Sequence, residues 1–193
     1  MPRQPTIRPY SDDDTDAITA IYADAVLHTT ATYEETPPSS ADMHQRLSAL
    51  RDAGFPCFVA EAEDESKKNQ RVIAGYAYAG PFRPRPAYRF TVEHSVYVAP
   101  GQRERGVGRL LMEALIGACE RLGFRQMVGV VGEPQANRAS MALHERMGFR
   151  EAGRLEGSGY KFGRWLDTAF MQRAIGGGAE RSPDGEAMPG GSR

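Results

Sequence analysis

The chain has 193 residues, of which 40% are hydrophobic and 9% aromatic, and this length and apolar content suit one globular domain with its own core. Its 24 lysines and arginines nearly balance 25 acidic residues, which gives a formal net charge of -1. This balance excludes a strongly basic nucleic-acid-binding protein and a strongly acidic disordered chain. A local basic patch stays open, but we expect no nucleic-acid partner.

The sequence predicts neither a membrane segment nor a secretion signal. The best apolar stretch, Leu110–Ile116, is interrupted by Glu113 and is too short to cross a bilayer. The first residues lack the apolar core of a signal peptide. The two cysteines, Cys57 and Cys119, stand among apolar neighbours and are too few for a disulfide scaffold or a four-cysteine zinc site. We therefore expect a cytoplasmic protein with buried free thiols.

Hydrophobic spacing and helix-ending glycines predict alternating strands and helices. In chain order we expect a strand at Thr6–Pro9, a helix after the caps Asp12–Asp14 that includes Ile18–Val26, a helix at Ser40–Ala53, strands at Phe55–Ala60, Val72–Ala79 and Phe90–Val98, a helix at Leu110–Leu122, a strand at Met127–Val131, a helix at Ala139–Met147, and strands at Glu151–Leu155 and Trp165–Ile175. This order predicts an α+β fold, with a single mixed central β-sheet and helices on both faces.

Two segments differ in composition from this alternating pattern. The charge-dense stretch Glu61–Arg71 separates two predicted strands and indicates a solvated hairpin tip. The segment Gly176–Arg193 is rich in glycine, proline and serine, and it has too little apolar surface to offset the entropy of ordering. We therefore predict one domain over residues 1–175 and a disordered tail over residues 176–193.

A glycine-containing segment joins the strand ending at Val98 to the next helix. Gly106 and Gly108 stand where this helix begins, and backbone N–H groups at a helix N-terminus favour a bound phosphate. A dinucleotide fingerprint would need a third glycine at position 111, which is leucine, and a nucleoside-triphosphate loop would need Gly-Lys-Ser/Thr. A structural turn and a pyrophosphate loop both stay open. The pyrophosphate is favoured by the nearby charges of Arg103, Arg105 and Arg109.

Glu93 lies inside a predicted strand among apolar and β-branched neighbours, where a carboxylate needs either water or a function. By strand alternation it shares a face with Arg89, Thr91 and Ser95. A solvated strand carboxylate and a general base are the two interpretations that the residues alone allow.

The spacing Arg103-x-x-Gly106-x-Gly108 resembles the acyl-CoA pyrophosphate loop of GNAT N-acetyltransferases, and the order of elements over Thr6–Ile175 resembles that fold. Four more segments narrow the resemblance: Thr30-Ala-Thr-Tyr-Glu-Glu-Thr-Pro, Tyr88-Arg-Phe-Thr-Val-Glu-His-Ser-Val-Tyr-Val, Leu143-His-Glu-Arg-Met-Gly-Phe and Lys161-Phe-Gly-Arg-Trp-Leu-Asp. Together they resemble the branch that acetylates phosphinothricin, methionine sulfone and methionine sulfoximine.

The resemblance implies acetyl-CoA as co-substrate and a direct transfer to an amine. It makes Glu93 the expected general base and His144 a second base, with which a shared proton relay is expected. It also implies that a backbone N–H of Tyr97 or Val98 polarises the thioester carbonyl. The expected acetyl-CoA-binding residues are Val96, Tyr97, Val98, Arg103, Glu104, Arg105, Gly106, Val107, Gly108, Arg109, Asn137 and Ser140.

On the acceptor side, the resemblance implies that Tyr33, Tyr88 and Gly132 contribute to the substrate pocket. At least one of Arg83, Arg85 and Arg89 is expected to pair with a substrate carboxylate, which arginine binds through two parallel hydrogen bonds. His28, His44 and His94 form no metal set with the cysteines, so we expect no metal.

The segment Lys161–Asp167 has two interpretations. From the residues, it is a strand-entry turn that packs Trp165 against the core. The resemblance places it near a dimer contact, so a homodimer is expected.

Other functions on the same fold stay open. One is acetylation of a polyamine, an aminoglycoside or a protein N-terminus, and another is a non-catalytic sensor that only binds acyl-CoA. The presence of both Glu93 and His144 argues against the sensor. The sequence does not name the physiological acceptor, the principal base or the arginine that binds the carboxylate.

Overall fold

The computed structural model describes residues 4–63, 71–180 and 182–183. In chain order its elements are β1 (Thr6–Pro9), η1 (Asp12–Asp14), α1 (Thr15–His28), α2 (Ser40–Asp52), β2 (Cys57–Glu63), β3 (Arg71–Pro81), η2 (Pro86–Tyr88), β4 (Thr91–Val98), η3 (Pro100–Gln102), α3 (Val107–Arg121), β5 (Gln126–Gly132), α4 (Arg138–Arg146), β6 (Arg150–Lys161) and β7 (Arg164–Ala174). Every helix and strand predicted from the sequence is present; β1 has the predicted ends, and most other elements are shifted at one end or both.

The strands form one sheet of seven, in the order β1-β2-β3-β4-β5-β7-β6. Only the β4–β5 pair among these neighbours is parallel, and the others are antiparallel. The sheet is therefore mixed, and the predicted α+β fold is confirmed.

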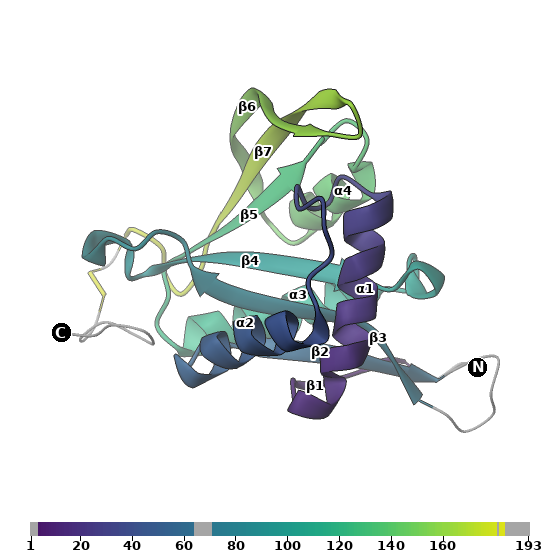
Figure 1. Ribbon diagram of the computed structural model, residues 1–193. Helices are drawn as coiled ribbons and strands as arrows, with labels where there is room; N and C mark the ends of the chain where they lie inside the picture. The colour runs from purple at the N-terminus through teal and green to yellow at the C-terminus, as the bar shows by residue number, and fades with distance from the viewer. Residues whose placement is uncertain (1–3, 64–70, 181, 184–193) are drawn as a thin grey trace.

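The two faces of the sheet have separate cores. Helices α1 and α2 cover one face, where Ile18 and Leu47 pack with Val59 and Tyr76. Helix α3 covers the other face through residues such as Leu111, and α4 lies on the same side because its apolar residues pack against that second core. Figure 1 shows α1 crossing the sheet on the near side, with α3 behind it.

β4 and β5 diverge after a short paired segment. Their pairing runs from Thr91 opposite Gln126 to His94 opposite Gly129, although β4 continues to Val98 and β5 to Gly132. Figure 1 shows the two strands separating toward α1 and α4. The end of β4 thus has backbone groups on its β5 side that this parallel pairing does not use, and we call this place the splay.

The largest difference from the prediction lies in β6. We expected a short strand ending at Leu155, but β6 continues to Lys161 with register shifts between Glu151 and Gly153 and between Leu155 and Gly159. The glycines of this segment disfavour a strand by propensity, and pairing with β7 overrides that preference. Likewise, α3 begins at Val107, three residues before the predicted start.

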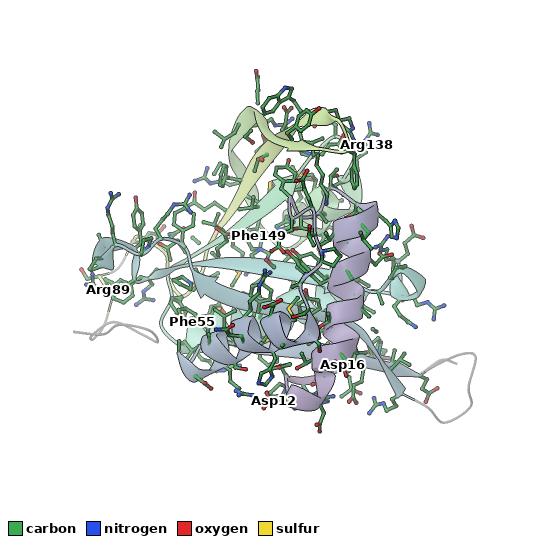
Figure 2. The ribbon with its side chains drawn as sticks, viewed as in Figure 1. Asp12, Asp16, Phe55, Arg89, Arg138 and Phe149 are labelled. Carbon is green, nitrogen blue, oxygen red and sulfur yellow. The ribbon has the colours of Figure 1, made fainter. Side chains whose placement is uncertain are left out.

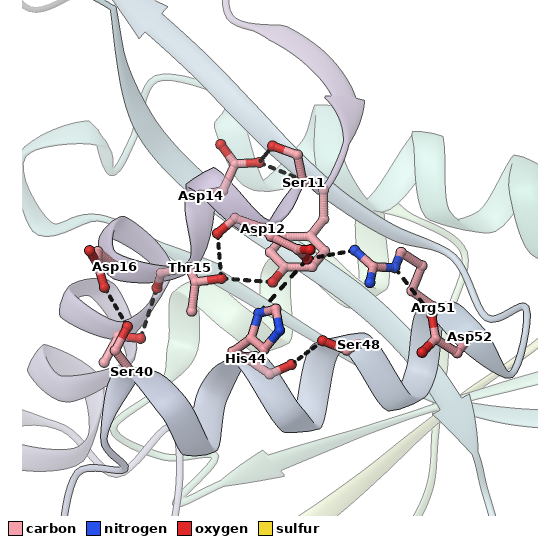
Figure 3. Close-up of polar contacts among 12 residues, drawn as sticks. Ser11, Asp12, Asp14, Thr15, Asp16, Ser40, His44, Ser48, Arg51 and Asp52 are labelled. Atoms are coloured by element: carbon pink, nitrogen blue, oxygen red, sulfur yellow. Dashed lines mark hydrogen bonds and ion pairs between the residues drawn. The ribbon is translucent and has the colours of Figure 1, made fainter.

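Polar contacts fix the start of α1 against α2, as Figure 3 shows. Arg51 donates to Asp12 at 2.6 Å, Ser40 donates to Asp16, and His44 lies 3.8 Å from Asp12. These acidic groups hold two helices together on the far side of α2 from the splay.

Parts of two predicted segments lie outside the described residues: 64–70 at the hairpin tip, and 181 and 184–193 in the tail. Gly176–Glu180, at the start of the predicted tail, form a turn in which the Gly178 N–H donates to the Ile175 carbonyl at 2.9 Å. No helix in the described part of the chain is long and apolar enough to cross a bilayer.

Candidate active site

Glu93 lies in the middle of β4, opposite Gly80 of β3 and Val128 of β5. Its face is the one covered by α1 and α2, because the register places it beside Gly80, whose Cβ direction meets Leu50 of α2. The carboxylate is half-buried. Burial raises the pKa of Glu93, and the positive charge of Arg83 offsets part of that rise. A carboxylate with a raised pKa is a stronger proton acceptor at neutral pH.

Tyr78 is a neighbour of Glu93 that the sequence reasoning did not select. It lies opposite Ser95 on the same face, two pairs along the ladder from Glu93. Burial raises the pKa of Tyr78, a hydrogen bond with Ser95 opposes the rise, and the charge of Glu93 adds to it. Its phenol therefore stays protonated at neutral pH, beside the carboxylate. The alternation of Tyr76 and Tyr78 along β3 could have indicated that Tyr78 shares a face of the sheet with Tyr76.

His144 projects from α4 onto the other face of the sheet. Its Nδ1 lies 2.7 Å from the carbonyl of Ser140, which can only accept a hydrogen bond. This contact assigns the proton to Nδ1 and leaves the lone pair on Nε2. Burial lowers the pKa of His144, and the Ser140 carbonyl acts in the opposite direction. The ring is therefore neutral near pH 7 and has a free basic nitrogen.

The expected direct relay between Glu93 and His144 is not supported by this arrangement. The ring of His144 lies beside His94 and Gly129, which form a rung of the ladder on the α3 side. Glu93 precedes His94 in the strand, so its side chain points to the opposite face. The sheet itself separates the two groups.

The glycine loop leaves the N-terminus of α3 open on one side. Gly106 is the N-cap of α3 with φ of 79°, and an added Cβ there meets nothing within 4 Å. The first N–H groups of α3 therefore face an open side of the loop. At Gly108 an added Cβ would lie 3.2 Å from Leu143 of α4 and 3.6 Å from Val98 of β4. A larger side chain at position 108 would therefore press α3 away from α4 and from the end of β4.

The charged residues of this loop lie at its exposed surface. Arg103 contacts Asp24 of α1 at 3.2 Å, and Arg109 pairs with Glu113 at 2.6 Å. Glu104 has a φ of 64°, a backbone conformation that is uncommon outside glycine. Arg105 is also exposed, and Val107 is buried under the loop. The expected loop residues are thus gathered around one helix N-terminus.

The final residues of β4 line the splay with alternating faces. Val96 and Val98 pack toward α3. Tyr97 lies on the other face, stacked on Tyr76 at 5.3 Å between ring centroids and edge-on to Tyr22 at 5.1 Å. These contacts hold the strand end in place while its backbone stays unpaired with β5.

Asn137, expected at the acetyl-CoA arm, is the N-cap residue of α4 but makes no capping hydrogen bond with its side chain. Its Nδ2 donates to Thr30 Oγ1 at 2.9 Å and to the Gly132 carbonyl at 2.5 Å. Asn137 thus joins the end of β5 to the segment after α1. Ser140 contributes its backbone carbonyl to His144.

The segment Thr29–Tyr33, here called the acceptor loop, is held against β5, β6 and β7. The Tyr33 hydroxyl donates to the Asp167 carbonyl at 2.5 Å and accepts from the Glu133 N–H at 3.2 Å. An added Cβ at Gly132 would lie 2.7 Å from the Tyr33 ring, and one at Gly159 would overlap the same ring. Both glycines are therefore required by the packing of Tyr33.

Lys161 is the second residue that the sequence reasoning missed as part of the site. It is 2% exposed, and its Nζ donates to the carbonyls of Thr29 at 2.9 Å and Thr32 at 2.8 Å. Burial lowers its pKa. Lys161 was noted only as the first residue of a sequence motif. It was missed as a site residue because a lysine at the end of a strand is usually exposed. Its role is to tie β6 to the acceptor loop.

The three candidate arginines lie exposed in and beside the loop between β3 and β4. Arg83 stacks on Phe82 at 4.4 Å, and its charge reaches Glu93. Arg89 ends η2 in a helical conformation, donates to the Pro86 carbonyl at 3.2 Å and stacks on Phe90.

Because β4 begins only at Thr91, the expectation that Arg89 shares a strand face with Glu93 is wrong. Figure 2 shows Arg89 at the outer end of this loop, away from Phe149 beside the histidines. Tyr88 packs edge-on against Phe82 and is 41% exposed, and Arg85 lies in the same exposed loop.

The segment Lys161–Asp167 does not pack Trp165 against the core. Trp165 is 69% exposed and contacts Tyr160 edge-on. Leu155, Tyr160 and Phe162 are also at least half exposed. An apolar surface therefore covers the outer strand β6 and its turn into β7.

A mixed sheet with a splay, a glycine loop opening α3 and a half-buried carboxylate on β4 together define an acyl-CoA-dependent transferase. Residues 18–149 match the model of the acetyltransferase (GNAT) family, and the chain belongs to that family.

Two similar proteins and one similar structure carry names that specify the acceptor. The chain is 46% identical to a phosphinothricin N-acetyltransferase of Alcaligenes faecalis, over 93% of this chain and 87% of that protein. It is 42% identical to an L-methionine sulfoximine/L-methionine sulfone acetyltransferase of Pseudomonas paraeruginosa, over 86% and 92%. The crystal structure of a phosphinothricin acetyltransferase from Sinorhizobium meliloti in complex with AcCoA superimposes with a TM-score of 0.87, at 45% identity and 96% coverage of both chains.

Proposed function

We propose that this enzyme transfers the acetyl group of acetyl-CoA to the α-amine of a small amino acid with a tetrahedral polar end group, such as phosphinothricin, methionine sulfone or methionine sulfoximine. The observation that carries the proposal is the half-buried Glu93, placed where β4 and β5 part, with the acceptor loop and Tyr33 on the same side of the sheet. The names of the relatives support the choice of substrate.

Acetyl-CoA, when bound, supplies an activated acetyl group and a thiolate leaving group. The α3 N-terminus with Gly106 and Gly108 would hold its pyrophosphate, and the unpaired edge of Val96–Val98 would hold its arm as an added strand does. A backbone N–H of Tyr97 or Val98 would donate to the reacting carbonyl. Asn137 has its Nδ2 engaged within the protein, so its Oδ1 is the atom left to accept from the arm. No metal enters this scheme.

Two proton acceptors on opposite faces match the chemistry of an ammonium acceptor. An α-ammonium must lose one proton before its nitrogen can attack, and it loses a second as the amide forms. Glu93, on the acceptor face, takes the first, directly or through water. His144 holds the second on Nε2 while its Nδ1–H stays on Ser140, on the side where the thiolate leaves. In this proposal Glu93 and His144 each accept one proton separately, instead of sharing one relay.

Positive charge at the acceptor side favours a substrate with a carboxylate or another anionic group. Arg83 stands close enough for its charge to act on Glu93, and Arg85 and Arg89 extend the same exposed loop. Tyr33 and Tyr88 would wall the aliphatic middle of the substrate, with the backbone of Gly132 beside Tyr33. A polyamine has no group for these arginines to bind.

We also propose that the enzyme is a homodimer whose contact includes β6. This outer strand is exposed along most of its length, and the exposed apolar residues Leu155 and Tyr160 of β6 lie near Trp165 at the start of β7. Contiguous apolar surface of this kind mostly marks an interface. A cytoplasmic location is supported by the free, buried thiols of Cys57 and Cys119, since free thiols are typical of a reducing compartment.

A thiol-release assay with acetyl-CoA and a panel of acceptors tests the function. The panel contains phosphinothricin, methionine sulfone, methionine sulfoximine, common amino acids, spermidine, an aminoglycoside and a peptide with a free N-terminus. We expect the highest kcat/KM for the first three. A preference for spermidine or the aminoglycoside would leave only the acetyltransferase class, and acetyl-CoA binding without turnover on any acceptor would support a sensor.

A further inference from the structure

His94 is a buried ionisable residue that the proposed chemistry does not use. It follows Glu93 in β4 and points to the opposite face, where it is 5% exposed. Neither of its ring nitrogens has a protein hydrogen-bond partner among the described residues. Burial of an unpaired polar group destabilises the folded state, and a phenylalanine or leucine at this position would avoid that cost.

His144 faces His94 with its own unpaired nitrogen. The ring centroids are 5.1 Å apart, and Nε2 of His144 likewise has no protein partner in the described part of the chain. Phe149 packs against both rings at 5.2 Å and closes them off on one side. The imidazole pair is thus held by apolar contacts and by one hydrogen bond, from Nδ1 of His144 to Ser140.

The two Nε2 atoms converge on one point above Gly129. A Cβ built on Gly129 would lie 2.5 Å from Nε2 of His144 and 2.7 Å from Nε2 of His94. Gly129 forms the last rung of the β4–β5 pairing with His94, at the base of the splay. The absence of a side chain at this position therefore brings two basic nitrogens to one place beside the unpaired end of β4.

We propose that His94 is a positioning residue that acts through His144: one water molecule bound between the two Nε2 atoms above Gly129 carries the proton to and from His144. The Nε2–H of His94 donates to the water oxygen, and the water donates to the Nε2 lone pair of His144. The water takes a proton from the reacting nitrogen as it gives one of its own to Nε2 of His144, and the imidazolium later returns a proton through the same water to the leaving thiolate of CoA. This inference rests on the proposed role of His144.

The electrostatics of the pair agree with this arrangement. Burial, together with the neighbouring His144, lowers the pKa of His94 to about 3, so His94 stays neutral and retains one N–H to donate. Gly129, Phe149 and the Ser140 carbonyl, which lie against the two rings, are uncharged. A proton shared with the water therefore has His144 as its stronger acceptor.

The water is tested without activity by a high-resolution crystal structure of the wild-type enzyme with CoA. We expect an ordered water within hydrogen-bond distance of both Nε2 atoms. Density for a direct contact between the rings, or for no solvent between them, would overturn the proposal whatever the enzyme acetylates. Loss of activity in His144→Ala tests the role of His144 separately.

Three variants test the effect on the reaction. His94→Phe keeps an apolar ring beside Phe149 but cannot hold the water, and His94→Gln keeps an N–H donor near the same place. Gly129→Ala keeps both histidines but places a Cβ 2.5 Å and 2.7 Å from their Nε2 atoms, so the rings must move and the water is displaced. We expect His94→Phe and Gly129→Ala to lower kcat by about 10- to 100-fold, because the proton path is lost. The KM for acetyl-CoA should stay unchanged, and His94→Gln should retain most of the turnover.

Two further readouts separate positioning from folding. Gly153→Ala is the matched control, because a Cβ there meets nothing within 4 Å. The limb of the kcat profile that reports His144 should move in His94→Phe, whereas a merely structural change would lower kcat at every pH alike. The proposal is overturned if folded His94→Phe keeps near wild-type turnover, or if His94→Gln loses as much as His94→Phe.

Discussion

Glu93 and His144 lie on opposite faces of the central sheet, with β4 and β5 between them. Glu93 lies opposite Gly80 and faces α1 and α2, whereas His144 packs beside His94 and Gly129 on the side of α3. Two proton acceptors separated in this way match the two protons that an α-ammonium loses. In the proposed mechanism the acceptor therefore approaches on the Glu93 face, and the second proton is taken up on the His144 face.

Removal of Arg83 should move the pH dependence of the reaction. Burial raises the pKa of Glu93 and the charge of Arg83 opposes the rise, so Arg83→Ala should raise this pKa further. The base must be unprotonated, and the acidic limb of the kcat/KM profile should therefore move to higher pH. Arg83→Lys keeps the charge and should leave the limb in place. An unmoved limb in Arg83→Ala would show that Arg83 does not act on Glu93.

A glutamate at position 108 should weaken CoA binding. The carboxylate would stand at the N-terminus of α3, where it favours the helix but repels a pyrophosphate. We expect the CoA affinity of Gly108→Glu to fall at least about tenfold, or 1.4 kcal/mol, by isothermal titration calorimetry. Gly153→Glu, on β6, should bind CoA normally. Wild-type affinity in a folded Gly108→Glu variant would move the pyrophosphate elsewhere.

Much of this site was visible in the sequence because it depends on local signals. Gly106 and Gly108 could be recognised from their place between a predicted strand and a predicted helix. Glu93 could be recognised from its apolar neighbours in the strand. The face on which His144 lies depends on which side of the sheet α4 packs, and that is a tertiary property. Arg89 was misplaced for a related reason: η2 interrupts the strand pattern just before β4.

Lys161 and Trp165 show a second limit of sequence reasoning. A lysine is mostly exposed and a tryptophan mostly covered, yet here the lysine is 2% exposed and the tryptophan 69%. Lys161 can be buried because its Nζ donates to two backbone carbonyls of the acceptor loop. The sequence of β6 gives no indication that these carbonyls, which belong to a distant segment, lie beside Lys161.

Lys161→Met should loosen the acceptor loop. The substitution leaves the carbonyls of Thr29 and Thr32 without their donor, and an unpaired buried acceptor costs about 1–3 kcal/mol. We expect a lower melting temperature and a higher KM for the amino acid, with the KM for acetyl-CoA unchanged. Lys161→Arg keeps N–H donors, so its melting temperature and its KM for the amino acid should lie between those of the wild type and Lys161→Met. Equal increases in both KM values would show a general loss of structure instead.

Trp165→Ser should weaken the dimer. Trp165 is 69% exposed beside Tyr160, and burial of an aromatic ring of this size against a second copy stabilises an interface. Sedimentation velocity at micromolar concentration should show a dimer for the wild type and a shift toward monomer for the variant. A monomeric wild-type enzyme would refute the interface, and an unchanged dimer would place it elsewhere.

The turnover of Glu93→Gln on methionine sulfone, with CoA affinity measured on the same preparation, tests the central claim most directly. Glutamine preserves the size of the side chain but cannot accept the ammonium proton. We predict that kcat falls by about 10²- to 10⁴-fold, that CoA affinity stays at the wild-type value, and that the acidic limb of the pH profile disappears. Turnover within a few-fold of the wild type, with that limb intact, would contradict the account and leave His144 or bulk water as the base.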